Sequence, residues 1–182
     1  METTKNSADR FQLLIKAYER FVPKQFLNLL GKDEIISVQL GDQIEKNMTI
    51  LFSDIRGFTS LSKQLTPQQT FNFLNSYLSQ MESVIMSHHG IIDKYAGDAI
   101  MALFPTSADN AVNCANAMRA RLWKYNIGRK RAGYEPVKIG IGLNSGLVML
   151  GTIGGSERIV DWLVNHTLKL DMHLDRFIKS KK

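Results

Sequence analysis

The feature that most constrains this chain is an apolar run, residues 48–52, that stops abruptly at the polar, glycine-containing segment 53–59. β-Branched and aromatic residues are frequent in the run, which predicts a buried strand. Asp54 therefore stands where a strand passes into a turn. A second carboxylate, Asp98, interrupts the apolar stretch 90–105, whose pattern predicts two short strands joined by a tight turn. The chain thus carries two aspartates, each at the edge of an apolar strand.

A long helix is expected between these strands, because Thr66, Pro67 and Gln69 follow the order of an N-cap, a first helical residue and a capping-box partner. A strand–helix–strand unit can place its strands side by side, so both carboxylates can converge at one edge of a sheet. Two adjacent carboxylates repel each other, and a pair of Mg²⁺ ions carrying a triphosphate is a usual solution in phosphoryl chemistry. The loop 55–59 adds backbone N–H groups that suit phosphate oxygens. The alternative, that each aspartate only caps its own turn, stays open on spacing alone.

The N-terminal part is expected to be helical after a frayed, polar start at residues 1–8. Apolar spacing over 10–30 predicts a helix that is interrupted at Val22-Pro23 and ended by Gly31. Such a helix either packs on its own domain or dimerises and couples a signal from an upstream domain. Both interpretations stay open on the spacing.

The rest of the chain alternates between strand and helix patterns. Phe71 and Val112 are expected on the buried faces of the two long helices, and Cys114 is expected to be a buried apolar residue. The expected elements are a short strand at 35–40, a strand at 48–52, a helix at 66–90, a hairpin at 91–104, a helix at 107–127, a basic loop at 128–133, a hairpin of strands 137–143 and 147–153 around the turn 144–146, and a helix over 159–179. This order predicts an α+β protein with helices packed on a sheet.

Composition narrows the class of protein further. Lys plus Arg is 23 and Asp plus Glu is 17, and the net charge of +6 favours polyanionic partners without choosing among them. A single cysteine excludes an intrachain disulfide and fits a reducing, cytoplasmic compartment. No apolar run reaches the roughly 18 residues of a membrane span. A Walker loop, a Gly-x-Ser-x-Gly elbow and a Cys-x-x-Cys pair are absent from the sequence, so P-loop hydrolysis, acyl transfer and zinc chemistry lack support.

Two further features have simple interpretations. The basic runs at 129–131 and 179–182 contain no interleaved aromatic residues, so solvated surface is favoured over a nucleic-acid site. His88 and His89 precede Gly90, and we expect them to cap helix carbonyls rather than bind a metal.

Three strings strongly resemble the class III nucleotide cyclase domain: TILFSDIRGFT at 49–59, DKYAGDAIMALF at 93–104 and GIGLNSG at 140–146. The resemblance implies a ferredoxin-like α+β cyclase fold, with a mostly antiparallel central sheet flanked by helices and preceded by an N-terminal helix. It also implies a helical coupling segment at 1–31, a cyclase domain at 32–182, and a head-to-tail homodimer with active sites at its interface.

The resemblance also implies specific chemistry. Asp54 and Asp98 match the two metal-binding aspartates of the family, and the backbone carbonyl of Ile55 would join them in holding two Mg²⁺ or Mn²⁺ ions. The ribose 3′-hydroxyl of a nucleoside triphosphate would then attack the α-phosphate, giving a 3′,5′-cyclic nucleotide and pyrophosphate. Lys94 matches the purine-selecting position, where a lysine favours ATP because it donates a hydrogen bond to adenine N1. The substrate-binding residues expected besides Lys94 are Gly57, Phe58 and Thr59.

The chain departs from the family pattern after Arg158. The second purine-contact position, normally Asp or Thr, falls on Trp162. The family's catalytic Asn and Arg fall on Lys169 and His173, which supply positive charge but not the same geometry. The strands that normally finish the domain would come after Lys182, so we expect a domain that is incomplete at its C-terminal end. The alternative hypothesis is a non-catalytic cyclase-like module that binds nucleotide and metal, or half of a site completed by a complementary cyclase domain.

Overall fold

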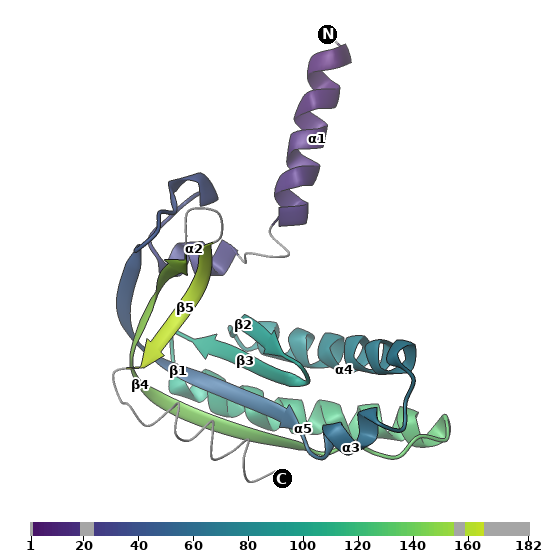
Figure 1. Ribbon diagram of the computed structural model, residues 1–182. Helices are drawn as coiled ribbons and strands as arrows, with labels where there is room; N and C mark the ends of the chain where they lie inside the picture. The colour runs from purple at the N-terminus through teal and green to yellow at the C-terminus, as the bar shows by residue number, and fades with distance from the viewer. Residues whose placement is uncertain (1, 19–23, 155–158, 166–182) are drawn as a thin grey trace. The chain divides into compact units, whose positions relative to one another are not determined.

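The computed structural model describes residues 2–18, 24–154 and 159–165, and its sheet has the strand order β2-β3-β1-β4-β5 (Figure 1). The elements are α1 (Glu2–Tyr18), α2 (Lys24–Leu29), the 3-10 helix η1 (Ile35–Ser37), β1 (Gln43–Ile55), α3 (Phe58–Ser62), α4 (Pro67–Ser87), β2 (Ile91–Ala96), β3 (Ala99–Phe104), α5 (Ala108–Arg131), β4 (Ile139–Gly154) and β5 (Ile159–Asn165). The expected α+β class is confirmed. The described residues divide into two compact units, one drawn from Met1–Ile44 and Leu150–Leu163 and the other from Glu45–Met149 and Val164–Lys182. The division expected between residues 31 and 32 stays a prediction.

In the second unit, α4 and α5 pack beside each other on one face of the strands β1, β2 and β3 (Figure 1). Alternate strand residues and helical stripes build the shared core, in which Cys114 is buried as expected. Its members include Leu51, Ile55, Ile100, Ala102 and Phe104 from the strands, and Tyr77, Met81, Ile85, Ala111, Cys114 and Met118 from the helices. Burial of this apolar surface is the main favourable contribution to the stability of the unit.

Helix α4 begins where the sequence predicts. The side chain of Thr66 accepts a hydrogen bond from the backbone N–H of Gln69 (3.2 Å), and the side chain of Gln69 accepts one from the N–H of Thr66 (2.8 Å). This reciprocal capping box satisfies two N–H groups that the helix itself leaves without partners. At the other end, a ring nitrogen of His88 lies 2.8 Å from the carbonyl of Val84, so the expected carbonyl-capping role is confirmed for this histidine.

The predicted hairpin is also confirmed. Strands β2 and β3 pair antiparallel up to Ala96 and Ala99, and the two-residue loop between them has a positive φ of 66° at Gly97. Only glycine adopts that conformation without steric cost, which explains the residue choice. Strand β3 then pairs antiparallel with β1, with Leu51 opposite Ala102.

In the first unit, the segment expected to form a strand at 35–40 is instead a 3-10 turn at Ile35–Ser37, so that expectation was wrong. Local polar contacts explain the turn. Ser37 donates its hydroxyl hydrogen to the carbonyl of Glu34 (2.6 Å), and a carboxylate oxygen of Asp42 accepts from the N–H of Gln39 (2.7 Å). The ammonium group of Lys32 lies 2.9 Å from the same carboxylate. The hydrogen bond from Gln39, followed by the contact with Lys32, lowers the pKa of Asp42 from its ordinary value.

The region 137–153 contradicts the expected hairpin, because β4 runs without a turn from Ile139 to Gly154. The predicted turn residues lie inside this strand, where Ser145 meets Thr49 of β1 through their hydroxyl oxygens at 2.7 Å. Pairing with the long neighbour β1 therefore overrides the local turn preference. Residues 159–165 form strand β5 rather than the expected helix, and the remainder of that expected helix lies outside the described residues.

Three smaller expectations were also wrong. Helix α5 continues to Arg131, so the basic residues 129–131 occupy its last turn, where cations interact favourably with the helix dipole, instead of a loop. Helix α1 begins at Glu2, within the segment expected to fray. Phe71 and Val112, expected on buried faces, are 66% and 48% exposed.

Within the described part of the chain, every helix is too short or too polar to cross a bilayer.

Candidate active site

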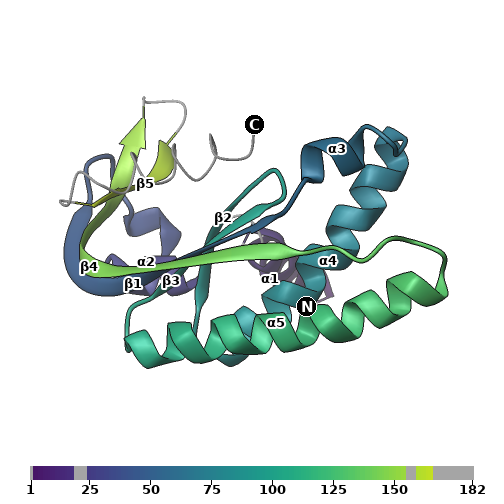
Figure 2. The same ribbon diagram turned by 90° about the horizontal axis from the view of Figure 1, so that it is seen from below.

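The fold brings Asp54 and Asp98 together, as the sequence predicts. Asp54 is the penultimate residue of β1, and Asp98 lies in the loop of the β2–β3 hairpin, whose tip is beside the end of β1 (Figure 2). The backbone N–H of Ile55 donates a hydrogen bond to a carboxylate oxygen of Asp98 at 3.0 Å. This bond fixes the hairpin loop to the strand end that carries the other carboxylate.

The electrostatics of the pair are unfavourable in the absence of a cation. Burial, followed by a hydrogen bond with the Asp54 side chain and by the charge of Asp54, raises the pKa of Asp98 from 3.8 to about 7. The N–H groups of Ile55 and of Asp98 itself oppose the shift. A carboxyl pair that shares a proton near neutral pH is a site where a positive ion would be stabilised.

The donor set fits a divalent cation that arrives with a nucleotide. Among the described residues, no three His, Cys, Asp or Glu side chains gather as a complete ligand set. Mg²⁺ commonly takes one or two carboxylates and completes its shell with water and substrate phosphates. The pair of Asp54 and Asp98 suits that arrangement better than a resident structural ion. The role expected for the carbonyl of Ile55 stays a prediction.

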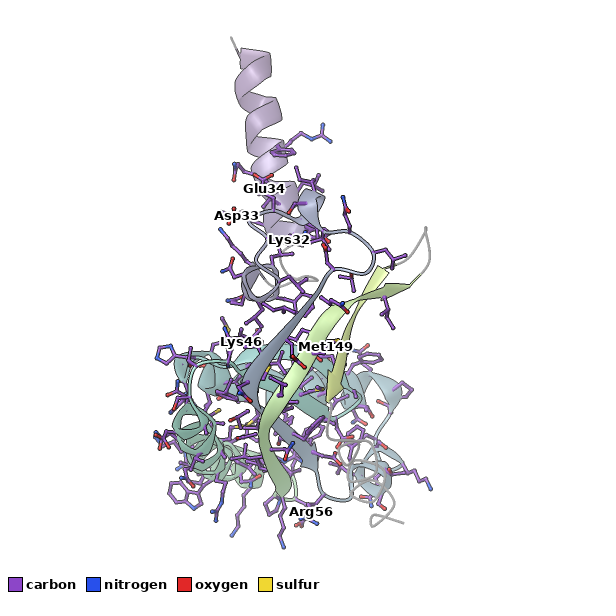
Figure 3. All side chains as sticks on the ribbon, turned by 90° about the vertical axis from the view of Figure 1, so that its left-hand side faces the viewer. Lys32, Asp33, Glu34, Lys46, Arg56 and Met149 are labelled. Carbon is purple, nitrogen blue, oxygen red and sulfur yellow. The ribbon has the colours of Figure 1, made fainter. Side chains whose placement is uncertain are left out.

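The segment after β1 forms a short helix that the sequence did not predict. Gly57 is its N-cap with a positive φ of 70°, and the N–H groups of Ser60 and Leu61 both bond to the carbonyl of Gly57. The backbone N–H of Arg56 donates a hydrogen bond to the carbonyl of Lys138 at 2.8 Å. Arg56 directly follows the C-terminal end of β1, whereas Lys46 lies near the other end of that strand (Figure 3). The expected phosphate-binding residues Gly57, Phe58 and Thr59 thus span the start of α3.

Lys94 lies on the same face of the sheet as Asp54. The strand registers put Phe52, Met101 and Lys94 opposite one another across β1, β3 and β2. Leu51 and Ile55 belong to the core beneath α4 and α5, and side chains alternate along a strand, so Phe52 and Asp54 point to the opposite face. Lys94 therefore also points away from the two helices.

The sequence did not predict a role for two buried hydroxyl groups close to the carboxylates, those of Ser53 and Tyr77. Ser53 and Tyr77 are both fully buried, and their hydroxyl oxygens make no hydrogen bond that satisfies normal geometry within the described residues. Burial raises the pKa of Tyr77 to about 12, with Ser53 opposing the shift and the charges of Asp98 and Asp54 adding to it. Their position one residue before Asp54 and on the facing helix was visible in the sequence, but no motif distinguished them from core residues.

The remaining predicted site residues are not tested by the geometry. Trp162 lies in β5. Lys169 and His173 lie outside the described residues. Cys114 lies in the hydrophobic core, and burial raises the pKa of its thiol to about 11.

Comparison with known proteins agrees with the class that the fold and the paired carboxylates define, a nucleotide cyclase catalytic domain. The family model for the adenylate and guanylate cyclase catalytic domain matches residues 41–166. The chain belongs to this family, whose catalytic domains are generally metal-dependent.

The relatives and similar structures include proteins named adenylate cyclase and proteins named guanylyl cyclase. An adenylate cyclase of Anabaena cylindrica is 35% identical over 179 residues, covering 96% of this chain and 36% of that protein. The guanylyl cyclase Cya2 has 36% sequence identity to this chain, and its crystal structure matches with a TM-score of 0.64. The match covers 76% of this chain and 73% of that one. The adenylyl cyclase CyaB from P. aeruginosa is 30% identical with a TM-score of 0.66, covering 74% and 73%. The chain spans 8% to 36% of the length of the first three curated relatives it matches.

Proposed function

We propose that this chain is an adenylate cyclase domain that converts ATP to 3′,5′-cyclic AMP and pyrophosphate. The observation that carries the proposal is the Asp54–Asp98 pair, held together at the end of β1 with the pKa of Asp98 raised to about 7. In the reaction, the ribose 3′-oxygen forms a bond to the α-phosphorus, and the bond from that phosphorus to the oxygen bridging to the β-phosphate breaks. Pyrophosphate leaves, and the 3′-hydroxyl proton passes to solvent.

The two aspartates and the carbonyl of Ile55 would hold two Mg²⁺ or Mn²⁺ ions. When bound, these ions lower the pKa of the ribose hydroxyl and neutralise charge on the triphosphate. The N–H groups of Gly57, Phe58 and Thr59 at the start of α3 bind phosphate oxygens, because first-turn N–H groups lack intrahelical partners.

Lys94 selects adenine over guanine. An ammonium group has three donors and no acceptor, so it matches the lone pair on adenine N1 and opposes the N–H at the same position of guanine. The fold alone does not decide the base, since the similar structures include both an adenylyl and a guanylyl cyclase. Lys169 and His173 are proposed to supply the positive charge at the α-phosphate.

Assembly is proposed with a second copy of the chain or with a complementary cyclase domain, and the site of action is the cytoplasm. The test is cyclic AMP formation from Mn²⁺-ATP by the purified chain, alone and mixed with an intact cyclase domain, with Mn²⁺-GTP compared. Asp54→Asn should abolish the activity, whereas Asp33→Asn, at an exposed aspartate of the first unit, should not. Cyclic GMP as the preferred product would overturn the assignment of Lys94.

Failure to form product in either mixture would overturn the enzyme proposal. Nucleotide binding that persists in that case would identify the chain as the non-catalytic module.

A further inference from the structure

The β2 strand contains one irregularity, and it lies immediately before Lys94. Ile92 is opposite Ala102 on β3, yet Lys94 is opposite Met101, the very next residue of that strand. Asp93 is therefore an extra residue, the bulged position of a β-bulge. Ladder pairing resumes regularly after it, with Tyr95 opposite Ile100.

This extra residue decides which face Lys94 occupies. Ile92 packs against the core beneath α4 and α5, so strict alternation would direct Lys94 to that same helix-covered face. The bulge shifts the alternation by one position and turns Lys94 to the opposite face, which also carries Asp54. Tyr95 then returns to the helix side, consistent with the charge of Glu82 on α4 contributing, after burial, to its raised pKa.

The bulged side chain also pairs with the lysine. The carboxylate of Asp93 lies 3.3 Å from the ammonium nitrogen of Lys94. Neighbouring residues of a regular strand point to opposite faces, so the bulge is what allows this contact. The Asp93 side chain is 1% exposed and that of Lys94 is 43% exposed. The carboxylate is thus buried, while the lysine side chain keeps part of its surface exposed.

We propose that Asp93 is a positioning residue for purine selection, which acts by placing and holding the ammonium group of Lys94. This inference rests on the proposed nucleotide site. A lysine side chain has a flexible four-carbon stem, and an ion pair at its tip limits the positions that the ammonium group visits. Because the Asp93 side chain is 1% exposed, the pair presents the ammonium donors of Lys94, rather than the carboxylate acceptors, to an incoming base. That pattern fits adenine N1 and rejects the N1–H of guanine.

The first test measures binding, so it does not depend on turnover. Dissociation constants for Mg²⁺-ATP and Mg²⁺-GTP are measured by calorimetry on the full chain and on Asp93→Asn, Lys94→Gln and the double variant. The wild type should prefer ATP, and Asp93→Asn should reduce the ratio of the two constants roughly threefold to tenfold. In the Lys94→Gln background, Asp93→Asn should leave the ratio unchanged, because a positioning residue has nothing left to position.

A matched control is available in the first unit, where Asp42 lies 2.9 Å from Lys32. Asp42→Asn removes a comparable ion pair and should leave the ratio of ATP to GTP affinity unchanged. If Asp93→Asn does not fold, Asp93→Ser removes the charge with a smaller side chain. A role in folding alone would weaken both nucleotides equally, and an unchanged ratio would overturn the proposal.

The second test needs no nucleotide. In lysine-labelled protein, the side-chain NMR signals of Lys94, identified by their loss in Lys94→Gln, should show an ordered stem in the wild type and a motionally averaged one in Asp93→Asn. Equal order in both proteins would overturn the positioning role. Failure of the wild type to bind either nucleotide, with the ordering difference intact, would instead overturn the proposed function and the purine selection built on it.

Discussion

Replacing Asp98 by asparagine should stabilise the metal-free protein, by an amount that grows from about pH 4 and is fully present above about pH 7. The pKa of Asp98 is raised from 3.8 to about 7 by burial and by the neighbouring Asp54. The folded state therefore retains a proton that the unfolded state releases between these two pH values, so stability falls as the pH rises through this window. Below about pH 4 the Asp98 side chain is protonated in both states, and its ionisation no longer affects the free energy of unfolding.

The size of the stabilisation expected for Asp98→Asn follows from the pKa shift of Asp98. At ~1.4 kcal/mol for each tenfold change in acidity, the full shift corresponds to about 4 kcal/mol at pH 8. Asp98 is only partly buried, and solvent screening reduces this to about 2 kcal/mol. For a chain of this length that is a rise of roughly 4–8 °C in melting temperature. Asparagine keeps the oxygen that accepts from the N–H of Ile55, so the native contact survives.

The assay is a series of thermal melts in EDTA, followed by circular dichroism, at intervals between pH 4 and pH 8. The Asp98→Asn variant should match the wild type at pH 4 and exceed it progressively above pH 5. Adding millimolar Mg²⁺ at pH 8 should narrow the gap, because only the wild type keeps both carboxylates. Asp33→Asn, at an exposed site, is the matched control. A difference between variant and wild type that stays constant over the whole pH range would refute the repulsion between the carboxylates.

Five further substitutions, two of them controls, test a helix cap, two glycines and a buried hydroxyl by melting temperature. Thr66→Ala removes the capping box of α4 and should lower stability by about 1 kcal/mol, whereas Thr66→Ser should retain most of it. Gly90→Ala should cost about 2 kcal/mol because the new Cβ would lie 2.6 Å from the side chain of Ile85, while Gly128→Ala in α5 has open space and should stabilise by about 0.5–1 kcal/mol. Tyr77→Phe removes a buried hydroxyl that makes no hydrogen bond of normal geometry within the described residues, so it should leave the melting temperature unchanged or raise it; a clear loss would show that the Ser53 hydroxyl is an effective partner.

Local chemistry made some of the fold predictable from the sequence. The start of α4 depends on three residues within one turn, and Thr66 and Gln69 make the two hydrogen bonds that their types suggest. The convergence of Asp54 and Asp98 was predictable for a similar reason. Each stands at the polar end of an apolar strand, and adjacent strands share an edge.

Non-local pairing explains the failures. Asn144-Ser145-Gly146 is a turn sequence by composition, yet it continues β4 because β1 is long enough to pair alongside it and Thr49 meets Ser145 there. Turn preferences of this kind amount to about 1 kcal/mol or less per residue, and an added row of strand hydrogen bonds exceeds that. Such competition depends on how far the neighbouring strand extends, which the window of residues around the turn does not contain.

The orientation of Lys94 shows the limit of reasoning from periodicity within the site itself. A period of two, counted back from Ala96, places Lys94 on the face of Ala96, and the register agrees. The same count carried from Ile92 places Lys94 on the helix-covered face, and only the extra residue Asp93 reconciles the two. A single inserted residue therefore decides whether the lysine points into the apolar core or lies on the opposite face, which also carries Asp54. The sequence contains one clue to this bulge, an acidic residue directly before the lysine, because in a regular strand such neighbours point apart and gain nothing from their opposite charges.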